Sequence, residues 1–366
     1  MTASVTSLLS RIAAISIGAL GLATLAACDG GTPASSNGGA ATAQPETTTA
    51  GGSATAAPTA PPQAEALGRD RYVIGMVAKS SANPVYIAAR AGAEAAARDI
   101  LEQEGVQVEL AWRTPLTEDA SRQAELVAEL MNASVDGIAL SATDPLVLAP
   151  AINRAAARGV RIVTFDADVP GSARFAYYGI DDGAAGATVM DELAKAMPGG
   201  GRVAVLAGNR TADNISRRVL GVVGAMDEID GYDLVGVFGH PETPEDAVAA
   251  MAKAHVEHGP IDGWALVGGW PLYAEGGLEG VPESVEIVSI DLLPATLDYL
   301  ESGRVRALVG QPYFGWGYES VQILFNSLHK GEMPSAAINA AEHEIATPSM
   351  APEFRERWAS WVGRAN

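Results

Sequence analysis

The sequence predicts an α/β protein with two parallel β-sheets, and three observations support this prediction. Short apolar runs rich in β-branched residues alternate with Ala-rich stretches of helical spacing from residue 71 onward. The runs are almost continuously apolar, which is typical of parallel strands covered by helices on both faces. About ten such runs are present, which is many for one open sheet. Two sheets, and therefore two lobes, are the simpler solution.

The predicted elements alternate regularly along the chain. In the first half the strands are 72–77, 107–112, 137–141, 161–165 and 175–180, and the helices are 84–102, 118–132, 146–158 and 184–196. The second half has strands at 202–206, 233–238, 263–267, 285–290 and 306–309, with helices between them and a last helix at 352–362. Strands that alternate with helices in this way favour sheets flanked by helices over separate all-α or all-β domains.

An apolar segment precedes the folded part and ends near the single cysteine of the chain. Residues 12–25 follow a short stretch whose only charged side chain is Arg11. The segment is shorter than the ~20 apolar residues that a membrane-spanning helix needs, and it predicts a signal peptide over residues 1–27. Its Leu-Ala-Ala-Cys end resembles the bacterial lipobox, in which the cysteine is acylated and becomes the first mature residue. Cys28 is then the lipid anchor; the alternative is an ordinary signal peptide with an unrelated cysteine.

Residues 28–68 are mostly Gly, Ala, Ser, Thr, Pro and Gln, a composition that predicts a flexible tether. The formal charge of the whole chain is −20, and removing residues 1–27 with Arg11 makes it −21. Such acidity argues against a nucleic-acid partner and against contact of the protein surface with anionic lipids. One cysteine excludes a disulfide within the chain and a cysteine-based metal site. We expect a monomer without a metal or cofactor.

Polar and aromatic residues follow directly after most of the predicted strands. In an open parallel sheet, ligands bind beyond the carboxyl ends of the strands, so these residues are the candidates for a binding site. In the first half the candidates are Lys79, Asn83, Tyr86, Ser141, Asp144, Asp166 and Asp168. In the second half they are Asp213, Asn214, Trp270, Asp291 and Gln311.

The order of these stretches resembles the ribose-binding type of periplasmic sugar-binding protein, the substrate-binding component of an ABC importer. The matching stretches are 79–86, 136–145, 163–168, 179–182 and 291–311. The resemblance implies two Rossmann-like lobes that enclose one ligand in a cleft. It also implies three chain crossings, near residues 178–181, 311 and 338–344. The lobes would be 69–179 plus 312–340 and 180–311 plus 341–366.

A site of this composition is suited to a sugar or polyol. Carboxylates make charge-assisted hydrogen bonds to hydroxyl groups, amides both donate and accept, and aromatic rings cover apolar CH faces. The resemblance makes Asp166 the main acceptor of the first lobe and Asp291 an acceptor of the second. Structural roles compete with ligand contact: Asn83 can cap a helix, and capping is the favoured role for Asp144 and Asp181. Trp270 can belong to the core, although a place in the cleft wall is favoured.

Two departures from the ribose-binding pattern disfavour ribose itself. Ala167 stands where the pattern has an arginine, and Ser216 stands at a second such position, with Arg217 and Arg218 close by. The Thr-Phe-Asp-Ala-Asp segment at 164–168, together with Lys79, resembles a neighbouring branch that binds other pentoses, deoxyhexoses, polyols or the signal autoinducer-2. The bulk of Trp270 argues against autoinducer-2.

We therefore expect a lipid-anchored protein that captures a sugar or polyol and delivers it to an ABC permease, on the periplasmic side or the outer face of a bacterial membrane. The alternative is a receptor domain that reports the same ligand to a chemotaxis or signalling partner. A glycan-acting enzyme is disfavoured, because a carboxylate pair such as Asp166 and Asp291 is a weak signal. The sequence also lacks a G-x-x-x-x-G-K loop, a G-x-S-x-G elbow and an H-E-x-x-H helix.

Overall fold

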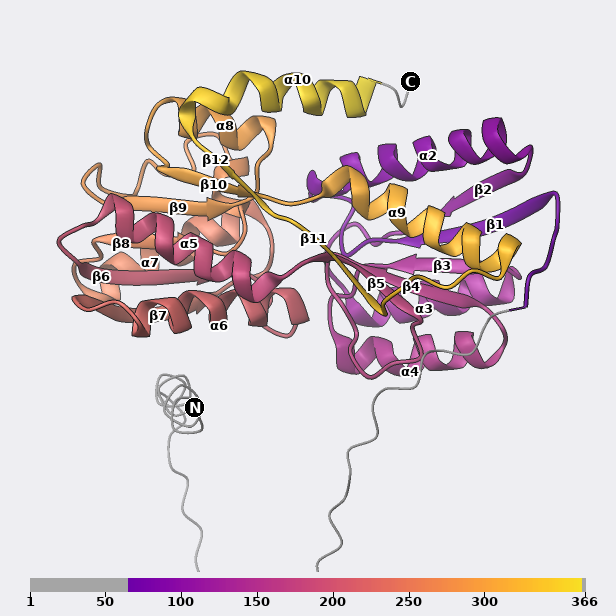
Figure 1. The fold of residues 1–366 in the computed structure, drawn as a ribbon. Helices are drawn as coiled ribbons and strands as arrows, with labels where there is room; N and C mark the ends of the chain where they lie inside the picture. Colours follow the sequence, from indigo (N-terminus) through magenta and orange to yellow (C-terminus); the bar gives the residue numbers. More distant parts are fainter. Residues whose placement is uncertain (1–64, 364–366) are drawn as a thin grey trace, which may run out of the picture. The chain divides into compact units, whose positions relative to one another are not determined.

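Two six-stranded sheets form the framework of the protein (Figure 1). The computed structural model describes residues 65–363, so the predicted signal peptide, Cys28 and the tether up to residue 64 lie outside the described part. The strand order is β11-β5-β4-β3-β1-β2 in the first sheet and β12-β10-β9-β8-β6-β7 in the second. Each paired strand is parallel to its neighbours except β12, which is antiparallel to β10. The predicted fold class is confirmed.

The first lobe covers its sheet with two helices on each face. Its strands are β1 (Arg71–Val77), β2 (Gln107–Trp112), β3 (Gly137–Leu140), β4 (Arg161–Phe165), β5 (Ala176–Ile180) and β11 (Ile338–Ala341). Its helices are α2 (Val85–Glu104), α3 (Ala120–Asn132), α4 (Pro145–Ala157) and α9 (Tyr313–Phe325), the last followed by a π-helical turn (Asn326–Lys330). One apolar core lies between the sheet and α2 and α9, and another lies between the sheet and α3 and α4. Because helices cover both faces of this sheet, the side chains on both faces of its strands are buried, which explains why the strands are almost continuously apolar.

The second lobe repeats this arrangement. Its strands are β6 (Gly201–Ala207), β7 (Tyr232–Gly239), β8 (Gly263–Leu266), β9 (Glu286–Ile290), β10 (Ala307–Gly310) and β12 (Glu344–Ala346). The helices are α5 (Asp182–Ala196), α6 (Asp213–Asp227), α7 (Pro244–His258), α8 (Pro294–Glu301) and α10 (Ala351–Val362), with 3-10 turns at Trp270–Tyr273 and Pro348–Met350. The predicted bounds agree with these to within about two residues. Strands β11 and β12 were not predicted.

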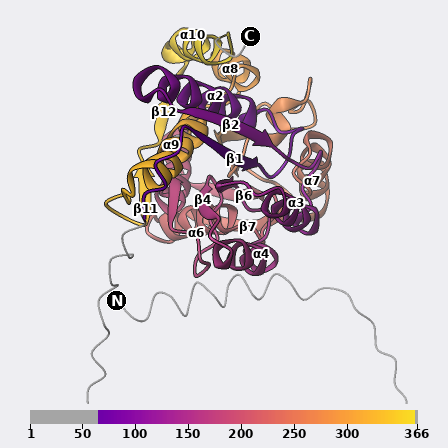
Figure 2. The same cartoon turned by 90° about the vertical axis from the view of Figure 1, so that its right-hand side faces the viewer.

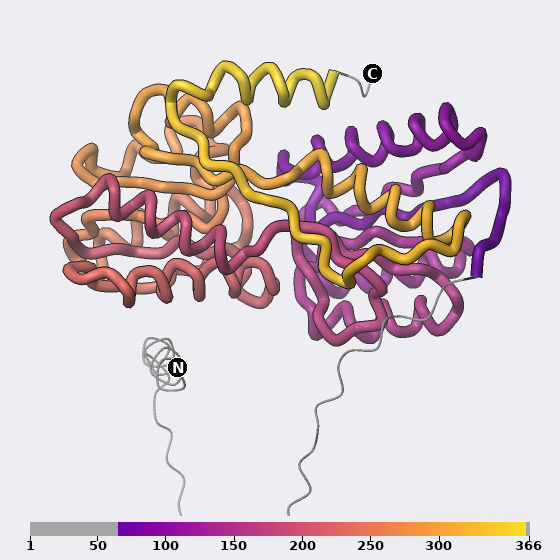
Figure 3. The backbone as a smooth tube through the Cα atoms, in the orientation of Figure 1, coloured from indigo at the N-terminus to yellow at the C-terminus, as the bar shows by residue number. Residues whose placement is uncertain are grey.

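The chain passes between the two sheets three times (Figure 3). It leaves the first sheet after β5, returns after β10 and leaves again between β11 and β12. These positions are those that the family resemblance implied. At the first crossing the Asp181 side chain accepts a hydrogen bond from the Ala184 backbone N–H, so it caps α5 as expected.

The close approach of paired helices depends on glycines. A Cβ atom at Gly317 of α9 would lie 1.8 Å from the Ala89 carbonyl oxygen of α2, and one at Gly186 of α5 would lie 2.0 Å from the Arg218 carbonyl oxygen of α6. Such distances are shorter than any van der Waals contact. The glycines therefore hold α9 and α6 close to their partners, and both of these helices supply residues to the site described below.

The C-terminal helix α10 contacts both lobes, although the sequence placed it in the second lobe alone. It packs against α8 of the second lobe and α2 of the first (Figures 1 and 2). Arg355 donates hydrogen bonds to Asp298 and Glu301 of α8. At the other end, Trp361 stacks on Phe314 of α9 with ring centroids 5.7 Å apart. Within residues 65–363, no helix combines the length and apolarity needed to span a membrane.

Candidate ligand-binding cleft

Eight of the twelve candidate residues line one small central pocket between the two sheets. They lie after strand ends or in the first turns of the helices that follow, in both lobes, as expected where the carboxyl ends of two parallel sheets face each other. The eight are Lys79, Asn83, Tyr86, Asp166, Asn214, Trp270, Asp291 and Gln311. The volume of this central pocket is about 20 Å³, which is enough for about one water molecule.

Asp166 is the hydrogen-bond acceptor of the first lobe in this pocket. It follows β4 with φ at 57°, a conformation that non-glycine residues rarely adopt. Its carboxylate accepts hydrogen bonds from the hydroxyls of Tyr86 at 2.9 Å and Ser141 at 2.8 Å, and from the Asn214 amide at 3.0 Å. Burial raises the pKa of Tyr86, which keeps its hydroxyl neutral and able to donate. Ser141 thus lies behind Asp166 rather than on the pocket wall, and Asn214 reaches across from the second lobe.

Asp291 has the equivalent position in the second lobe. It follows β9 with φ at 88°. Its carboxylate accepts hydrogen bonds from the Gly269 N–H at 2.9 Å, the Tyr273 hydroxyl at 2.6 Å and the Gln311 amide at 2.8 Å. Two acids in the same uncommon backbone conformation therefore face one pocket from opposite lobes. Strain of this kind is concentrated at functional sites in proteins.

Arg218 connects the central pocket to Asp182 at the first crossing. It was not among the residues predicted from the sequence. Its guanidinium donates to Asp182 at 2.7 Å and to the Gln311 side-chain oxygen at 2.6 Å, and it lies 3.9 Å from Asp166. Burial raises the pKa of Asp182 to about 6, although Arg218 acts in the opposite direction. The sequence signal was the spacing: Asn214 and Arg218 are four residues apart on α6 and therefore share one helix face. Arg217, in contrast, pairs with Asp213 at the surface.

A charged trio closes one side of the pocket and crosses the cleft. The Lys79 ammonium lies 2.9 Å from Glu118 of the first lobe and 3.1 Å from Glu242 of the second, and the lysine side chain is 3 % exposed. Burial and the neighbouring Glu118 raise the pKa of Glu242 to about 8. Lys79 and hydrogen bonds lower the pKa of Glu118 against the effect of burial. Neither glutamate was predicted from the sequence, because each follows its strand by several residues rather than directly.

Besides Ser141, three candidates do not line the pocket, and each has another partner. Asp144 caps α4 and accepts a hydrogen bond from the Leu146 N–H at 2.8 Å, so the structural role favoured for it is observed. Asp168 forms a bidentate ion pair with Arg174 in the first lobe. Asp213 is paired with Arg217, as described above. The structure therefore does not support ligand contact by these three aspartates.

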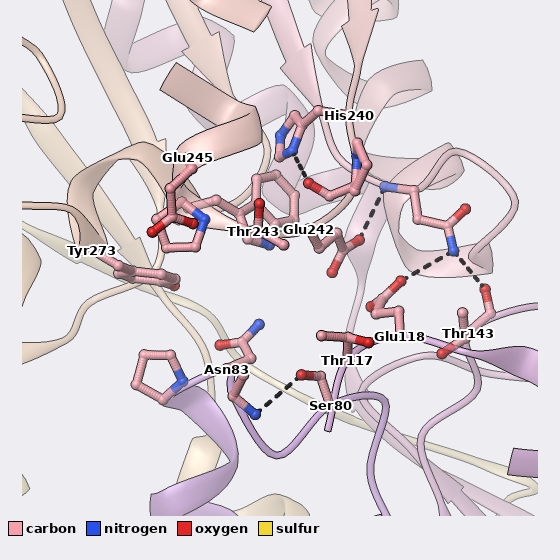
Figure 4. Close-up of a pocket in the computed structure, with 16 residues that line it drawn as sticks. Ser80, Asn83, Thr117, Glu118, Thr143, His240, Glu242, Thr243, Glu245 and Tyr273 are labelled. Atoms are coloured by element: carbon pink, nitrogen blue, oxygen red, sulfur yellow. Dashed lines mark hydrogen bonds between the residues drawn. The ribbon is translucent and has the colours of Figure 1, made fainter. Parts of the chain in front are cut away.

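A second, larger cavity opens beside the central pocket. Its volume is about 890 Å³, and it shares Asn83, Glu242 and Trp270 with the central pocket. Figure 4 shows residues of both lobes around it, with the carboxylates of Glu118 and Glu242 beside one another. We call it the outer cavity. Among residues 65–363, no group of three or more His, Cys, Asp or Glu side chains is arranged to hold a metal ion.

The two lobes are in direct contact around these cavities. The Asn209 side chain of the second lobe donates to Glu118 at 3.1 Å and to the Thr143 carbonyl oxygen at 3.2 Å (Figure 4). Together with the bonds from Asn214 to Asp166 and from Lys79 to Glu242, these contacts join both lobes on several sides. The structure is thus a closed form.

Comparison with known proteins identifies relatives of the same architecture. The family model described as a periplasmic binding protein domain matches residues 74–332. A solute-binding protein of an ABC transporter from Burkholderia graminis, solved with D-arabinose, has a TM-score of 0.69 and 24 % identity over 76 % of this chain and 96 % of its own. A glucose-galactose binding protein from Geobacillus stearothermophilus has a TM-score of 0.69 and 23 % identity over 78 % of this chain and 100 % of its own. No curated protein matches the sequence.

Proposed function

Because the chain belongs to the periplasmic binding protein family, whose model matches residues 74–332, we propose that it captures a sugar or polyol between its lobes and delivers it to an ABC permease. Members of this family are binding proteins, so the prediction that the chain is not an enzyme is confirmed. The relatives named above carry D-arabinose or are described as binding glucose and galactose, which supports the proposed ligand class.

The observation that carries the proposal is the pair Asp166 and Asp291, which face one pocket from opposite lobes beside aromatic rings. Their partners in the closed form are hydroxyl and amide donors such as Tyr86 and Asn214. The hydroxyl groups of a sugar have the same donor chemistry and can replace these donors. Trp270 and Trp316 line the pocket and can cover the apolar face of a ring.

A sugar ring cannot enter the central pocket while the lobes are closed as in this structure. The pocket of about 20 Å³ has room for one water molecule. The ligand therefore requires the lobes to separate, which breaks the hydrogen bond from Asn214 to Asp166. It then favours closure by bonding to both lobes at once, because a ligand shifts such an equilibrium only through its differential affinity for the two forms.

Ribose is disfavoured among the possible sugars. Ala167 replaces one arginine of the ribose-binding pattern, as noted from the sequence. Arg218 lines the pocket and provides a guanidinium near the second arginine position. We propose that this site holds a pentose, hexose or polyol with one arginine rather than two.

We also propose that the two-lobed part of the protein works close to a membrane. The Leu-Ala-Ala-Cys sequence at Cys28 and the polar composition that follows it support a lipid anchor and a tether on an exported protein. A tether raises the effective concentration of the two-lobed part at a permease. Mass spectrometry of the protein from its native membrane tests this: an unmodified thiol at Cys28 contradicts the anchor.

Calorimetry tests the site and the ligand class together. A thermal-shift screen of pentoses, hexoses, polyols, nucleosides and amino acids first identifies the ligand. A ligand present at 100 times its dissociation constant stabilises the folded form by ~2.7 kcal/mol, which the screen detects. Asp291→Ala should then abolish binding, whereas Asp191→Ala on the exposed face of α5 should leave it unchanged. Unchanged affinity in Asp291→Ala refutes the site. A shift with a nucleoside or an amino acid but with no sugar or polyol refutes the ligand class.

A further inference from the structure

The outer cavity is the larger of the two spaces in the cleft. At about 890 Å³ it lies within the range of ligand pockets in proteins, whereas the central pocket of about 20 Å³ holds one water molecule. Both lobes line the outer cavity: Glu118 and Thr143 come from the first, and Glu242 and His240 from the second. A group bound there contacts both lobes and adjoins the central pocket through Asn83 and Trp270.

The charged groups on the wall of the outer cavity are all acidic. Three carboxylates line it, from Glu118, Glu242 and Glu245, and in the described part of the chain no lysine or arginine lines it. Lys79 lies behind the wall, paired with both Glu118 and Glu242. Because one ammonium balances only one of these two carboxylates, the wall has negative charge in excess when both are ionised.

Two further side chains of the wall have buried polar atoms without a hydrogen-bond partner. They are Nε2 of His240 and Oγ1 of Thr143, whose residues are 8 % and 5 % exposed. The Nδ1 atom of His240 lies 2.5 Å from the Pro241 carbonyl oxygen, so Nδ1 carries the proton and donates. Burial lowers the pKa of His240, so the ring is neutral and Nε2 is an acceptor. The Nε2 acceptor is buried within the wall, and unsatisfied buried atoms of this kind call for an explanation.

We propose that the outer cavity binds an ammonium group of the ligand, so that the protein captures an amino sugar or another amine-bearing polyhydroxylated compound. This inference rests on the proposed function and specifies its substrate class. Once the lobes have separated enough to admit the ring, the hydroxyl groups of such a ligand bond to Asp166 and Asp291. Its ammonium group donates to Glu118 and Glu242 on the wall, and Trp270 and Tyr273 place aromatic rings beside it.

Without ligand, the carboxyl pair of Glu118 and Glu242 holds a proton, and the ammonium group of the ligand should displace that proton. Burial and the nearby Glu118 raise the pKa of Glu242 to about 8, so the carboxyl pair retains a proton at pH 7. The other titratable groups near Lys79, Glu118 and Glu242 do not alter this protonation state. Tyr86, Tyr273 and His240 are neutral at pH 7, and the negative charge of Asp166 raises the pKa of Lys79, which keeps the lysine protonated. A cation beside a carboxyl group lowers its pKa. Binding of an amine near neutral pH should therefore release a proton, whereas binding of a neutral sugar should not.

Calorimetry of the full chain with matched sugars tests the inference. D-glucosamine is compared with D-glucose, and D-galactosamine with D-galactose, because each pair differs only in an ammonium in place of a hydroxyl. A charge-assisted hydrogen bond is stronger than a neutral one, so an amino sugar should bind at least about tenfold more tightly than its parent. Titrations in phosphate and in MOPS at pH 7 should give heats that differ in proportion to the difference between the ionisation heats of the two buffers, with close to one proton released.

Two variants separate the wall from the rest of the protein. Glu242→Gln should reduce the ratio of amino-sugar to parent-sugar affinity to near one and abolish the proton release. Glu118→Gln gives a second reading if the first variant unfolds. Glu102→Gln, on an exposed position of α2, should leave the ratio and the proton release unchanged.

The outcomes distinguish this inference from the proposed function. If parent sugars bind and amino sugars bind no more tightly, the inference is overturned and the proposed function stands. A preference for amino sugars that persists in Glu242→Gln and Glu118→Gln also overturns it. If neither kind of sugar binds and another class of compound does, both the inference and the proposed function fail.

Discussion

Replacement of Arg218 with methionine should destabilise the protein through the charges that it leaves behind. The guanidinium is 3 % exposed and donates hydrogen bonds to Asp182 at 2.7 Å, to Gln311 at 2.6 Å and to the Val267 carbonyl oxygen at 3.2 Å. Methionine retains much of the apolar stem but has no donor. Asp182, itself 4 % exposed, then becomes a buried carboxylate without its ion-pair partner.

The expected cost is about 3–5 kcal/mol, the range for removing one partner of a buried ion pair. Unfolding entropy is roughly 2.1 cal/mol/K per residue near 60 °C, so about 300 folded residues give ~0.6 kcal/mol/K. The midpoint of thermal unfolding should therefore fall by roughly 5–8 °C. A loss of less than about 1 °C would refute the view that Arg218 balances a buried charge.

The pH dependence gives a second and independent reading of the same variant. The pKa of Asp182 is about 6 in the folded protein against an ordinary value of 3.8. The folded state thus binds this proton more tightly than the unfolded state, and stability falls as pH rises between the two values. Without Arg218 the folded pKa rises further, so the deficit of Arg218→Met should be larger at pH 8 than at pH 5. The added change Asp182→Asn should recover more than half of it at pH 8, and a deficit independent of pH would contradict the reasoning.

Two further predictions concern closure of the lobes. The pKa of Glu242 is raised to about 8 in the closed form and should return toward 4.5 when the lobes separate, so closure should weaken as pH rises from about 5 to about 8, by up to about tenfold per pH unit, and change little above pH 8. Fluorescence transfer between labels on the two lobes measures this equilibrium. Glu242→Gln should remove the pH dependence, and a flat wild-type profile between pH 5 and 8 contradicts the prediction. Trp361→Ala removes the stacking of α10 on Phe314, which joins the lobes in this closed form. If the contact is lost when the lobes separate, the variant should weaken ligand binding by about two- to tenfold in calorimetry, since such pairs contribute ~0.5–1.5 kcal/mol. Val256→Ala at an exposed site is its control, and equal affinity in a folded Trp361→Ala protein would show that α10 does not act on closure.

The two central acids could be predicted from the sequence because their positions follow from local rules. Asp166 and Asp291 come directly after buried strands, and ligands bind beyond the carboxyl ends of the strands of a parallel sheet. Asp144 was correctly given a cap as its favoured role, because a short acceptor before Pro145 is typical of a helix start. These features depend on neighbours in the chain, which the sequence displays directly.

The role of Asp168 could not be predicted in the same way. It lies two residues after Asp166, yet its carboxylate is bound by Arg174, which follows a turn in the same lobe. Both acids were candidates because they follow the same predicted strand. The path of the turn places an arginine beside only one of them, and that path depends on the packing of the lobe.

The sequence by itself determined the two-sheet α/β fold, the extent of most strands and helices, and the two acids at the strand ends. It could do so because periodicity, helix caps and strand ends depend on residues that are close in the chain. The tertiary structure alone decided that Lys79 joins Glu118 to Glu242, that α10 contacts both lobes, and that a larger acidic cavity lies beside a nearly filled central pocket. Those features require residues far apart in the chain to meet, such as Lys79 and Glu242, which are 163 positions apart. Only the packing of one lobe against the other brings them together.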